Sequence, residues 1–259
     1  MSSKLLPDNF EKKINEAVEH FWQLRLETNS VSQEGGRGAV ISGGNMDGFA
    51  SIIREIVIHC GFPEDSVIVK GKRNLTIPGY FRPTKMWDAL VIYKSRLIAV
   101  FELKSQVGSF GNNFNNRTEE SIGSAKDFWT AHREKAFSLE NFSNKETIQQ
   151  LNSRDVHPPF LAYLMLLEYC DASKSPVKVE EEHFKVFPVF KDSSYATRYK
   201  ILCERLMLEN MYSVTSLIYS DRVKGLKDGS YSSPTTSLNP KNLFAEFAGK
   251  LLAAKEIYG

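Results

Sequence analysis

The chain has 259 residues, with 33 lysines and arginines against 31 aspartates and glutamates, so its formal net charge is +2. Hydrophobic residues make up 42% and charged residues 25%, which excludes a disordered, collagen-like or coiled-coil chain. No apolar run approaches the roughly 18 residues of a membrane span, and the first residues predict no secretory signal. The three cysteines, Cys60, Cys170 and Cys203, lack CxxC spacing and predict reduced core thiols in a cytoplasmic protein.

The positive charge is unevenly distributed along the chain. The 52 residues from Ser66 to Arg117 contain nine basic residues and only two acidic ones, Asp88 and Glu102, for a net charge of +7. The remaining residues must carry −5 to give the overall +2. A strongly basic segment in a chain of nearly neutral net charge is expected where one face of the protein binds a polyanion. A solvated surface whose charges happen to cluster gives the same count.

The first part of the chain predicts two helices and then a hairpin. Apolar residues at helical spacing predict helices over about 8–28 and over 47–60, the second stopped by Gly61. Residues 29–45 between them are rich in glycine and serine and predict a loop. A strand is expected at 67–69, then a proline-containing loop. Two apolar runs, 87–93 and 97–104, joined by 94–96, give the strongest hairpin signal in the chain.

The rest of the chain alternates helices and strands. Residues 105–117 (SQVGSFGNNFNNR) predict a Gly/Asn loop, and a helix is expected over about 118–137. A buried strand is predicted at 160–170, a helix at 195–210, a strand at 213–220, and a last helix with Asn239 as cap and Pro240 as first residue. This order predicts an α/β fold with a central mixed β-sheet flanked by helices. We expect a single domain, 1–259, with a catalytic core of about 46–170 on which the C-terminal part, 171–259, packs.

The predicted hairpin brings charged residues together at one end. Glu102 and Lys104 are two residues apart, so both project from one face of their strand, which Ile98 and Val100 share. If the turn centres on Ser95, residues whose numbers sum to 190 oppose each other. Asp88 then lies across from Glu102, with roughly 4.5–5.5 Å between their Cβ atoms.

Two facing carboxylates repel each other unless a cation lies between them. Mg²⁺ takes carboxylate oxygens and keeps water ligands, so Asp88 and Glu102 are the predicted metal ligands. Lys104 on the same face would contact a phosphate or the attacking water, and Gln106 would orient a water or an adjacent phosphate. These residue types at this spacing indicate a site that hydrolyses phosphodiesters. The competing interpretation is a hairpin end with ordinary surface charges.

The order Asp88, thirteen residues, Glu102-Leu103-Lys104 resembles the PD-(D/E)XK nuclease motif, with Trp87 in place of its proline. The surrounding sequence closely resembles the XhoI family of type II restriction endonucleases. This resemblance rests on GGNMDGF (43–49), PGYFRPTKMWD (78–88), ELKSQVGSFGNNFNNRTEESIG (102–123) and DFWTAHREKAF (127–137), and more weakly on 187–206. It implies a PD-(D/E)XK nuclease-like core and a Mg²⁺-dependent homodimer that cuts palindromic duplex DNA, with CTCGAG as the implied site. A cognate DNA methyltransferase is expected in the same cell as a separate protein.

Basic and asparagine-rich residues around the motif are the candidate DNA contacts. Asparagine can pair with adenine and arginine with guanine in the major groove, so the segment after the motif is expected to contact bases or phosphates. Arg82 and Lys85 are expected to contact phosphate or bases, and the basic residues near position 70 to hold backbone phosphates. The predicted DNA-binding residues are Lys70, Lys72, Arg73, Arg82, Lys85, Asn112, Asn113, Asn115, Asn116 and Arg117.

Three other functions stay open. A repair or recombination nuclease would use the same metal site but recognise DNA structure instead of sequence. A non-catalytic DNA-binding module would carry the motif by accident. A metabolic α/β enzyme is disfavoured, since the glycines fit neither GxGxxG nor GxxxxGK. Asp47 and Glu55 are weaker candidates for a further metal ligand, because Asp47 already has a structural role as an acid at a helix N-terminus and Glu55 lies one turn from the apolar face.

Overall fold

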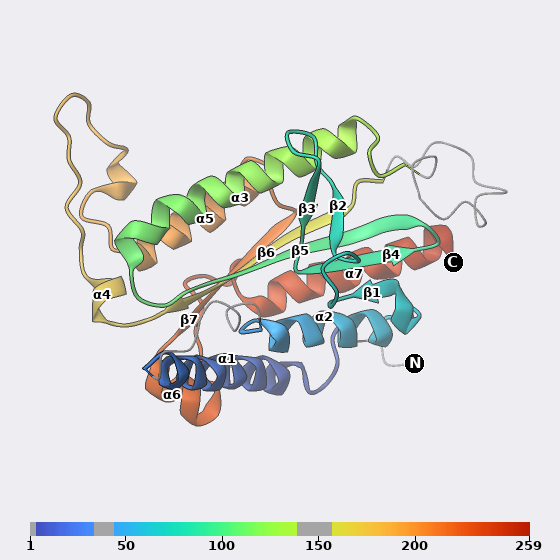
Figure 1. Cartoon of the computed structure of the whole chain (residues 1–259), viewed down its shortest axis with the longest axis horizontal. Coiled ribbons are helices and arrows are strands. Elements are labelled where there is room, and N and C mark those ends of the chain that lie inside the picture. The colour runs from blue at the N-terminus through green and yellow to red at the C-terminus, as the bar shows by residue number, and fades with distance from the viewer. Residues whose placement is uncertain (1–3, 34–43, 139–156) are drawn as a thin grey trace.

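The computed structural model describes residues 4–33, 44–138 and 157–259, and structural statements refer to these residues. Most of the predicted Gly/Ser loop, 34–43, lies outside them. In chain order the elements are α1 (Phe10–Gln33), α2 (Asp47–His59), β1 (Val67–Ile68), β2 (Thr76–Pro78), β3 (Thr84–Met86), β4 (Ala89–Tyr93), β5 (Arg96–Gln106), α3 (Phe110–Arg133), β6 (Phe160–Glu168), α4 (Asp171–Lys174), α5 (Tyr195–Leu208), β7 (Val214–Ser220), α6 (Arg222–Asp228) and α7 (Pro240–Tyr258), with short 3-10 helices at Glu64–Ser66 and Pro188–Phe190 (Figure 1).

The central sheet is mixed, with the strand order β1-β4-β5-β6-β7. β1, β4 and β5 pair antiparallel, whereas β5, β6 and β7 run parallel. Every residue of β6 is buried, without the alternation of a half-exposed strand, because helices cover the sheet on both faces. The predicted single α/β domain with a mixed sheet flanked by helices is confirmed.

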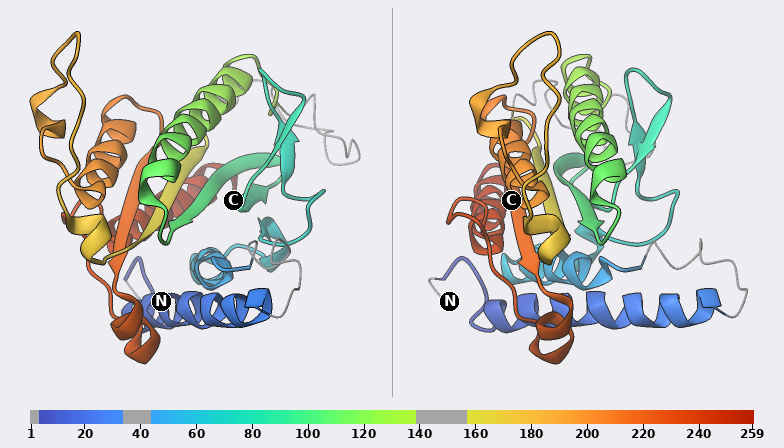
Figure 2. Two further views of the ribbon diagram at one scale, coloured as in Figure 1. Left: turned by 60° about the vertical axis from the view of Figure 1, so that its left-hand side comes forward. Right: turned by 90° about the vertical axis from the view of Figure 1, so that its left-hand side faces the viewer.

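Helices form a layer on each side of the sheet (Figures 1 and 2). α1, α2 and α7 pack on one face and α3 and α5 on the other, and each layer encloses its own apolar core. In the first core Phe101 of β5 lies edge-on to Phe247 of α7, with ring centroids 4.8 Å apart and both rings fully buried. In the second, Trp87 packs on Phe128 of α3 at 5.6 Å. The sheet is thereby held rigidly between two layers.

Phe247→Ala should cost about 3–5 kcal/mol of unfolding free energy, since a fully buried ring is lost and the cavity only partly collapses. Urea denaturation followed by circular dichroism measures this loss. Phe184, which is 88% exposed, provides the matched control, and Phe184→Ala should change stability by no more than about 0.5 kcal/mol. Equal effects of the two substitutions would contradict the assignment of α7 to the core.

The β4–β5 hairpin has the predicted register at its charged end, but through a different turn. Lys94 and Ser95 both have positive φ, 47° and 62°, and form a two-residue turn. A bulge then leaves Ile98 as an extra residue on β5, which shifts the pairing so that Ala89 faces Phe101. The predicted position of Ile98 was wrong, because the bulge turns it into the core under α7, away from the face of Glu102.

The predicted loop at 105–117 was also wrong over most of its length, because α3 begins at Phe110. Asparagine is a weak helix former, but tertiary packing outweighs that preference here. The rings of Phe110 and Phe114 pack on Tyr195 of α5, with centroids 6.0 and 6.3 Å away. Packing of this kind is not visible in local sequence.

Two further segments are more regular than predicted. α1 continues to Gln33 instead of ending near Thr28. The proline-containing loop folds into a second, two-stranded hairpin in which Thr76 faces Met86 and Pro78 faces Thr84. Pro78 is tolerated because it stands at the end of an edge strand, where no ladder hydrogen bond from its nitrogen is needed.

No described helix is both long and apolar enough to cross a membrane. All three cysteines are free, as predicted. Cys60 and Cys203 are buried, but Cys170 is only half-buried, so the predicted core position was wrong for it. Burial raises the pKa of the Cys203 thiol to about 12, so it stays protonated and is no candidate nucleophile.

Candidate active site

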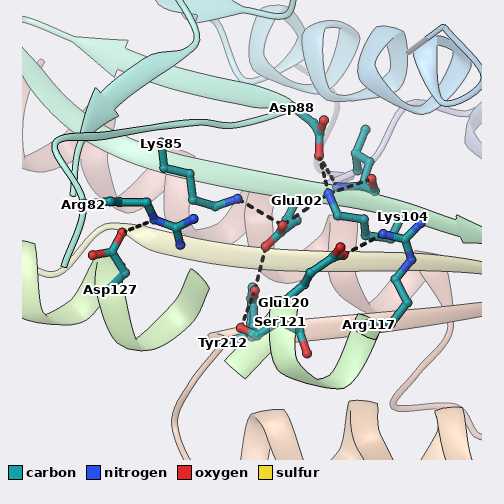
Figure 3. A network of polar contacts seen from close by, with 11 residues as sticks. Arg82, Lys85, Asp88, Glu102, Lys104, Arg117, Glu120, Ser121, Asp127 and Tyr212 are labelled. Carbon is teal, nitrogen blue, oxygen red and sulfur yellow. Dashed lines mark hydrogen bonds and ion pairs between the residues drawn. The ribbon is translucent and has the colours of Figure 1, made fainter. Parts of the chain in front are cut away.

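The predicted site lies at the open end of the β4–β5 hairpin (Figure 3). Asp88 immediately precedes β4, and its backbone N–H donates to the Phe101 carbonyl at 3.1 Å. Its Oδ2 accepts a hydrogen bond from the Leu103 backbone N–H at 2.7 Å. These two bonds continue the hairpin register and fix Asp88 beside Glu102. Glu102 and Lys104 project from β5 on the side that α3 covers.

Glu102 is a buried carboxylate with three donors around it. Its Oε1 lies 3.1 Å from Lys85 Nζ and 3.2 Å from Lys104 Nζ, and its Oε2 accepts from the Tyr212 hydroxyl at 2.8 Å. Burial alone would raise the pKa of Glu102, but the two lysines and Tyr212 outweigh burial and hold it below its ordinary value. Glu102 is therefore ionised at neutral pH despite being 2% exposed.

Lys104 stands between the two carboxylates. Its Nζ lies 3.5 Å from Asp88 Oδ2 and 3.2 Å from Glu102 Oε1. Burial lowers the pKa of Lys104, but Glu102 and Asp88 outweigh burial and raise it, so the ammonium is charged at neutral pH. Its positive charge offsets the repulsion that the sequence predicted between Asp88 and Glu102.

The two carboxylates fit a hard divalent cation. Such an ion is commonly held by one or two carboxylates, with water and phosphate oxygens filling its other positions. The position of the Lys104 ammonium shows that Asp88 Oδ2 and Glu102 Oε1 converge closely enough to share one positive charge. Within the described part of the chain, no cluster of three or more acidic, His or Cys side chains offers a richer ligand set.

Glu102 and Lys104, but not Asp88, line a hollow of about 460 Å³ between β3, β5 and α3. Its lining comprises Arg82, Lys85, Glu102, Lys104, Arg117, Glu119, Glu120, Gly123 and Ser124. The four basic side chains come from three separate segments of the chain. An anionic group such as a phosphate that enters the hollow would therefore meet cations on several sides.

Three of the predicted DNA contacts, Arg82, Lys85 and Arg117, line this hollow. Lys85 also lies over the Trp87 ring, with its Nζ 4.2 Å from the ring centroid. Trp87, which stands in place of the motif's proline, therefore helps to position Lys85. Arg117 donates from Nη1 to Glu120 Oε2 at 2.6 Å, one turn further along α3. The structure thus brings together three of the basic residues nearest the motif, while their predicted contact with DNA stays a prediction.

The four asparagines lie in the first two turns of α3 and not in a loop. By helical spacing, Asn113 and Asn116 belong to the same side of the helix as the residues that line the hollow, Asn112 lies at its edge and Asn115 furthest from it. Asn113 Nδ2 also donates to the Ser109 carbonyl at 3.1 Å. A helix presents these amides more rigidly than a loop would.

The remaining candidates lie outside the lining of the hollow. Lys70, Lys72 and Arg73 are exposed in the turn after β1. Gln106 is buried, and its Nε2 donates to the Gly108 carbonyl, which supports the turn into α3. Glu55 pairs with Lys13 of α1 at 3.0 Å, and neither it nor Asp47 is among the described residues that line the hollow.

Sequence reasoning missed two residues that hold the site. Tyr212, between α5 and β7, donates to Glu102 although 110 positions separate the two residues, and no local pattern marks it. Asp127 of α3 is buried and accepts from Arg82 Nε at 2.9 Å. An acid on the apolar side of a predicted helix was a usable signal for Asp127, since buried carboxylates need partners.

Tyr212→Phe should raise the pKa of Glu102, because it removes a donor that stabilises the ionised carboxylate. A pH titration of glutamate carboxyl carbons by ¹³C NMR measures the change. Tyr163→Phe is the matched control, since the Tyr163 ring lies 5.3 Å from that of Tyr212 and its hydroxyl faces Met165 Sδ. An unchanged pKa in Tyr212→Phe would show that the hydrogen bond contributes nothing.

Loss of the hydrogen bond between Tyr212 and Glu102 should also change the stability of the fold. The depressed pKa of Glu102 contributes stability that is present above the unfolded pKa and lost as pH falls through the folded pKa. Tyr212→Phe should therefore reduce the free energy of unfolding at neutral pH and reduce its dependence on pH on the acid side.

Comparison with known proteins points to one family. The family model of restriction endonuclease XhoI matches residues 25–233, which include Asp88, Glu102 and Lys104. The type II restriction enzyme BstVI of Geobacillus stearothermophilus is 47% identical over 215 residues, covering 81% of this chain and 88% of the relative. The type II restriction enzyme XhoI of Xanthomonas vasicola is 47% identical over 197 residues, covering 74% and 73%. The type II restriction enzyme AbrI of Azospirillum brasilense is 40% identical over 183 residues, covering 68% and 75%. No solved structure matches the chain.

Proposed function

The chain belongs to the XhoI family of restriction endonucleases, and from that premise we propose that it makes Mg²⁺-dependent double-strand cuts at a short palindromic DNA site. The reaction is hydrolysis of one phosphodiester in each strand, leaving 5′-phosphate ends. CTCGAG is the site implied by the family resemblance. The enzyme works in the cytoplasm, where a separate methyltransferase protects the host's own copies of the site.

The observation that carries this proposal is that Lys104 pairs with both Asp88 and Glu102, and that Glu102 and Lys104 line a hollow with three further basic side chains. Asp88 and Glu102 would hold the metal ion, which polarises the phosphate and lowers the pKa of a bound water. The Lys104 ammonium holds the attacking water and a phosphate oxygen in line with the bond to be cut. Attack at phosphorus breaks the bond to the 3′ oxygen, which leaves as a hydroxyl.

The other predicted residues act around this centre. Arg82, Lys85 and Arg117 line the hollow and neutralise neighbouring phosphates. Gln106 acts through the turn it supports, because that turn begins the helix that carries Arg117. The α3 asparagines contact bases or phosphates, and the basic turn after β1 holds the DNA backbone.

A homodimer accounts for a palindromic site. Each subunit of a two-fold dimer meets one half of the palindrome and one of the two strands. One active site of this kind per subunit is then sufficient for a double-strand cut.

Digestion of long duplex DNA tests the proposed function against its alternatives. With Mg²⁺ the protein should give a ladder of discrete, sequence-defined fragments, and with EDTA it should give none. Nicking confined to flaps or junctions would indicate a repair or recombination nuclease. Binding without any cleavage in Mg²⁺ would indicate a non-catalytic DNA-binding module.

A further inference from the structure

The tip of the β2–β3 hairpin presents two exposed aromatic rings. Tyr80 is 53% and Phe81 67% exposed, and their rings meet edge to face with centroids 4.9 Å apart. The hairpin stands out from the sheet beside α3 (Figures 1 and 2). The two rings together form one contiguous exposed apolar surface, the kind of feature that marks contact sites when it lies beside a binding hollow.

The conformation of this tip is fixed by one buried carboxylate. Asp127 Oδ1 accepts from the backbone N–H groups of Tyr80 and Phe81, at 2.8 and 2.7 Å, and its Oδ2 accepts from Arg82 Nε at 2.9 Å. Burial would raise the pKa of Asp127, but Arg82 and the two backbone donors outweigh burial and lower it. The ionised carboxylate therefore holds three consecutive residues at once.

Close packing at Gly79 fixes the tip further. A Cβ atom at this position would lie 2.7 Å from Asp127 Oδ2 and 2.7 Å from the Arg82 carbonyl, so a larger residue would displace one of them. The tip is consequently built in one conformation before any ligand arrives, which reduces the entropy lost on binding.

The position of the tip identifies its partner. Arg82 and Lys85 belong to the same hairpin and line the hollow that contains Glu102 and Lys104. With the scissile phosphate at Lys104, an adjoining phosphate is within the hollow that Arg82 and Lys85 line, and the two rings immediately precede Arg82. An aromatic ring makes apolar contact with base edges in a groove, such as the thymine methyl, while arginine pairs with phosphate, so the two residue types match adjacent parts of one DNA strand.

We propose that residues 79–82, held by Asp127, are a preformed DNA-contact element in which Arg82 takes a phosphate beside the scissile one and Tyr80 and Phe81 pack in the adjoining groove. This proposal rests on the proposed function, because its ligand is the duplex that the enzyme cuts. Tyr80 and Phe81 are direct contacts, whereas Asp127 is a positioning residue that acts through the loop.

Equilibrium binding to a fluorescent duplex tests the contacts, using the sequence that the wild type cuts and Ca²⁺ in place of Mg²⁺. Phe81→Ala and Tyr80→Ala should each weaken binding about tenfold, with an unchanged salt slope, since apolar contacts release no counterions. Arg82→Ala should instead make the negative slope of log K against log salt shallower by about 1, because one phosphate contact is lost. Phe184→Ala is the matched control, since Phe184 is 88% exposed but follows three glutamates that repel phosphate, and it should bind as the wild type does.

The results separate this proposal from the proposed function. A wild type that cuts DNA, with Tyr80→Ala and Phe81→Ala binding equally well, would overturn the contact element and leave the nuclease intact. Equal weakening by Phe81→Ala and Phe184→Ala would overturn it as well. A wild type that cuts no DNA would instead remove the proposed function itself.

A double-mutant cycle tests the role of Asp127. Asp127→Asn should weaken DNA binding, and adding Phe81→Ala to it should weaken binding little further, because both substitutions act through one loop. Fully additive losses would overturn the positioning role. A merely structural effect would lower the melting temperature without this loss of additivity, so the melting temperature of each variant is measured alongside.

Discussion

Lys104→Met should lower the rate of DNA cleavage on the order of 100- to 1,000-fold while DNA binding in Ca²⁺ stays close to that of the wild type. Methionine keeps the length of the aliphatic chain but removes the ammonium that lies between Asp88 and Glu102. A charged donor aimed at the reacting phosphate is worth about this much in the transition state. Single-turnover cleavage of a labelled duplex at saturating enzyme measures the rate of the chemical step without product release.

Lys94, in the same β4–β5 hairpin, provides the control for Lys104→Met. Lys94 lies in the turn at the far end of the hairpin, where its Nζ donates to the Tyr258 carbonyl. Lys94→Met should cut at the wild-type rate. Wild-type cleavage by Lys104→Met, or equal losses in the two variants, would remove Lys104 from the active site.

Asp88→Asn should lower cleavage by about a thousandfold, because loss of a metal ligand forfeits several kcal/mol of charge stabilisation in the transition state. The asparagine Oδ1 can still accept the hydrogen bond from the Leu103 N–H, so the hairpin register is kept. Asp88 is also 39% exposed, and its substitution removes no fully buried charge.

Two readouts identify the defect in Asp88→Asn. Its cleavage should need much higher Mg²⁺ concentrations than the wild type, and Mg²⁺ should raise its melting temperature less, since a cation that binds only the folded state stabilises that state. Asp171→Asn is the control, because Asp171 is exposed and pairs with Lys174 of α4. Wild-type cleavage by Asp88→Asn at the same Mg²⁺ concentration would contradict its assignment as a ligand.

The charged end of the hairpin was predictable because its determinants are local. The alternation of side chains along β5 places Glu102 and Lys104 on one face, and antiparallel pairing brings Asp88 opposite. The turn itself was predicted one residue too long. The bulge at Ile98 restored the register, so the expected pairing at the site arose from two departures that cancel.

The remaining parts of the site depend on contacts between distant segments. Tyr212 reaches Glu102 because β5, β6 and β7 are neighbours in the sheet, an order that no local pattern indicates. The extended α3 depends on the packing of Phe110 and Phe114 against α5. Asp127 acts through a hairpin tip 45 to 47 positions earlier in the chain.

The structure also divides the basic segment into parts. Arg82, Lys85, Lys104 and Arg117 converge on the hollow. Lys94 and Arg96 instead lie at the other end of the hairpin beside the C-terminal helix, where the Arg96 guanidinium is 4.4 Å from the Tyr258 ring. A charge count along the sequence therefore identified the segment that contributes cations to the hollow but overstated how many of them lie there.

Sequencing the DNA ends produced by the purified protein tests the central claim most directly. Plasmid DNA is incubated with Mg²⁺ or with EDTA, and both strands of every product are sequenced from their termini. The account predicts cuts at one palindromic hexamer, CTCGAG, with 5′-phosphate ends, in Mg²⁺ alone. Ends scattered without a common sequence, or cleavage that persists in EDTA, would contradict it.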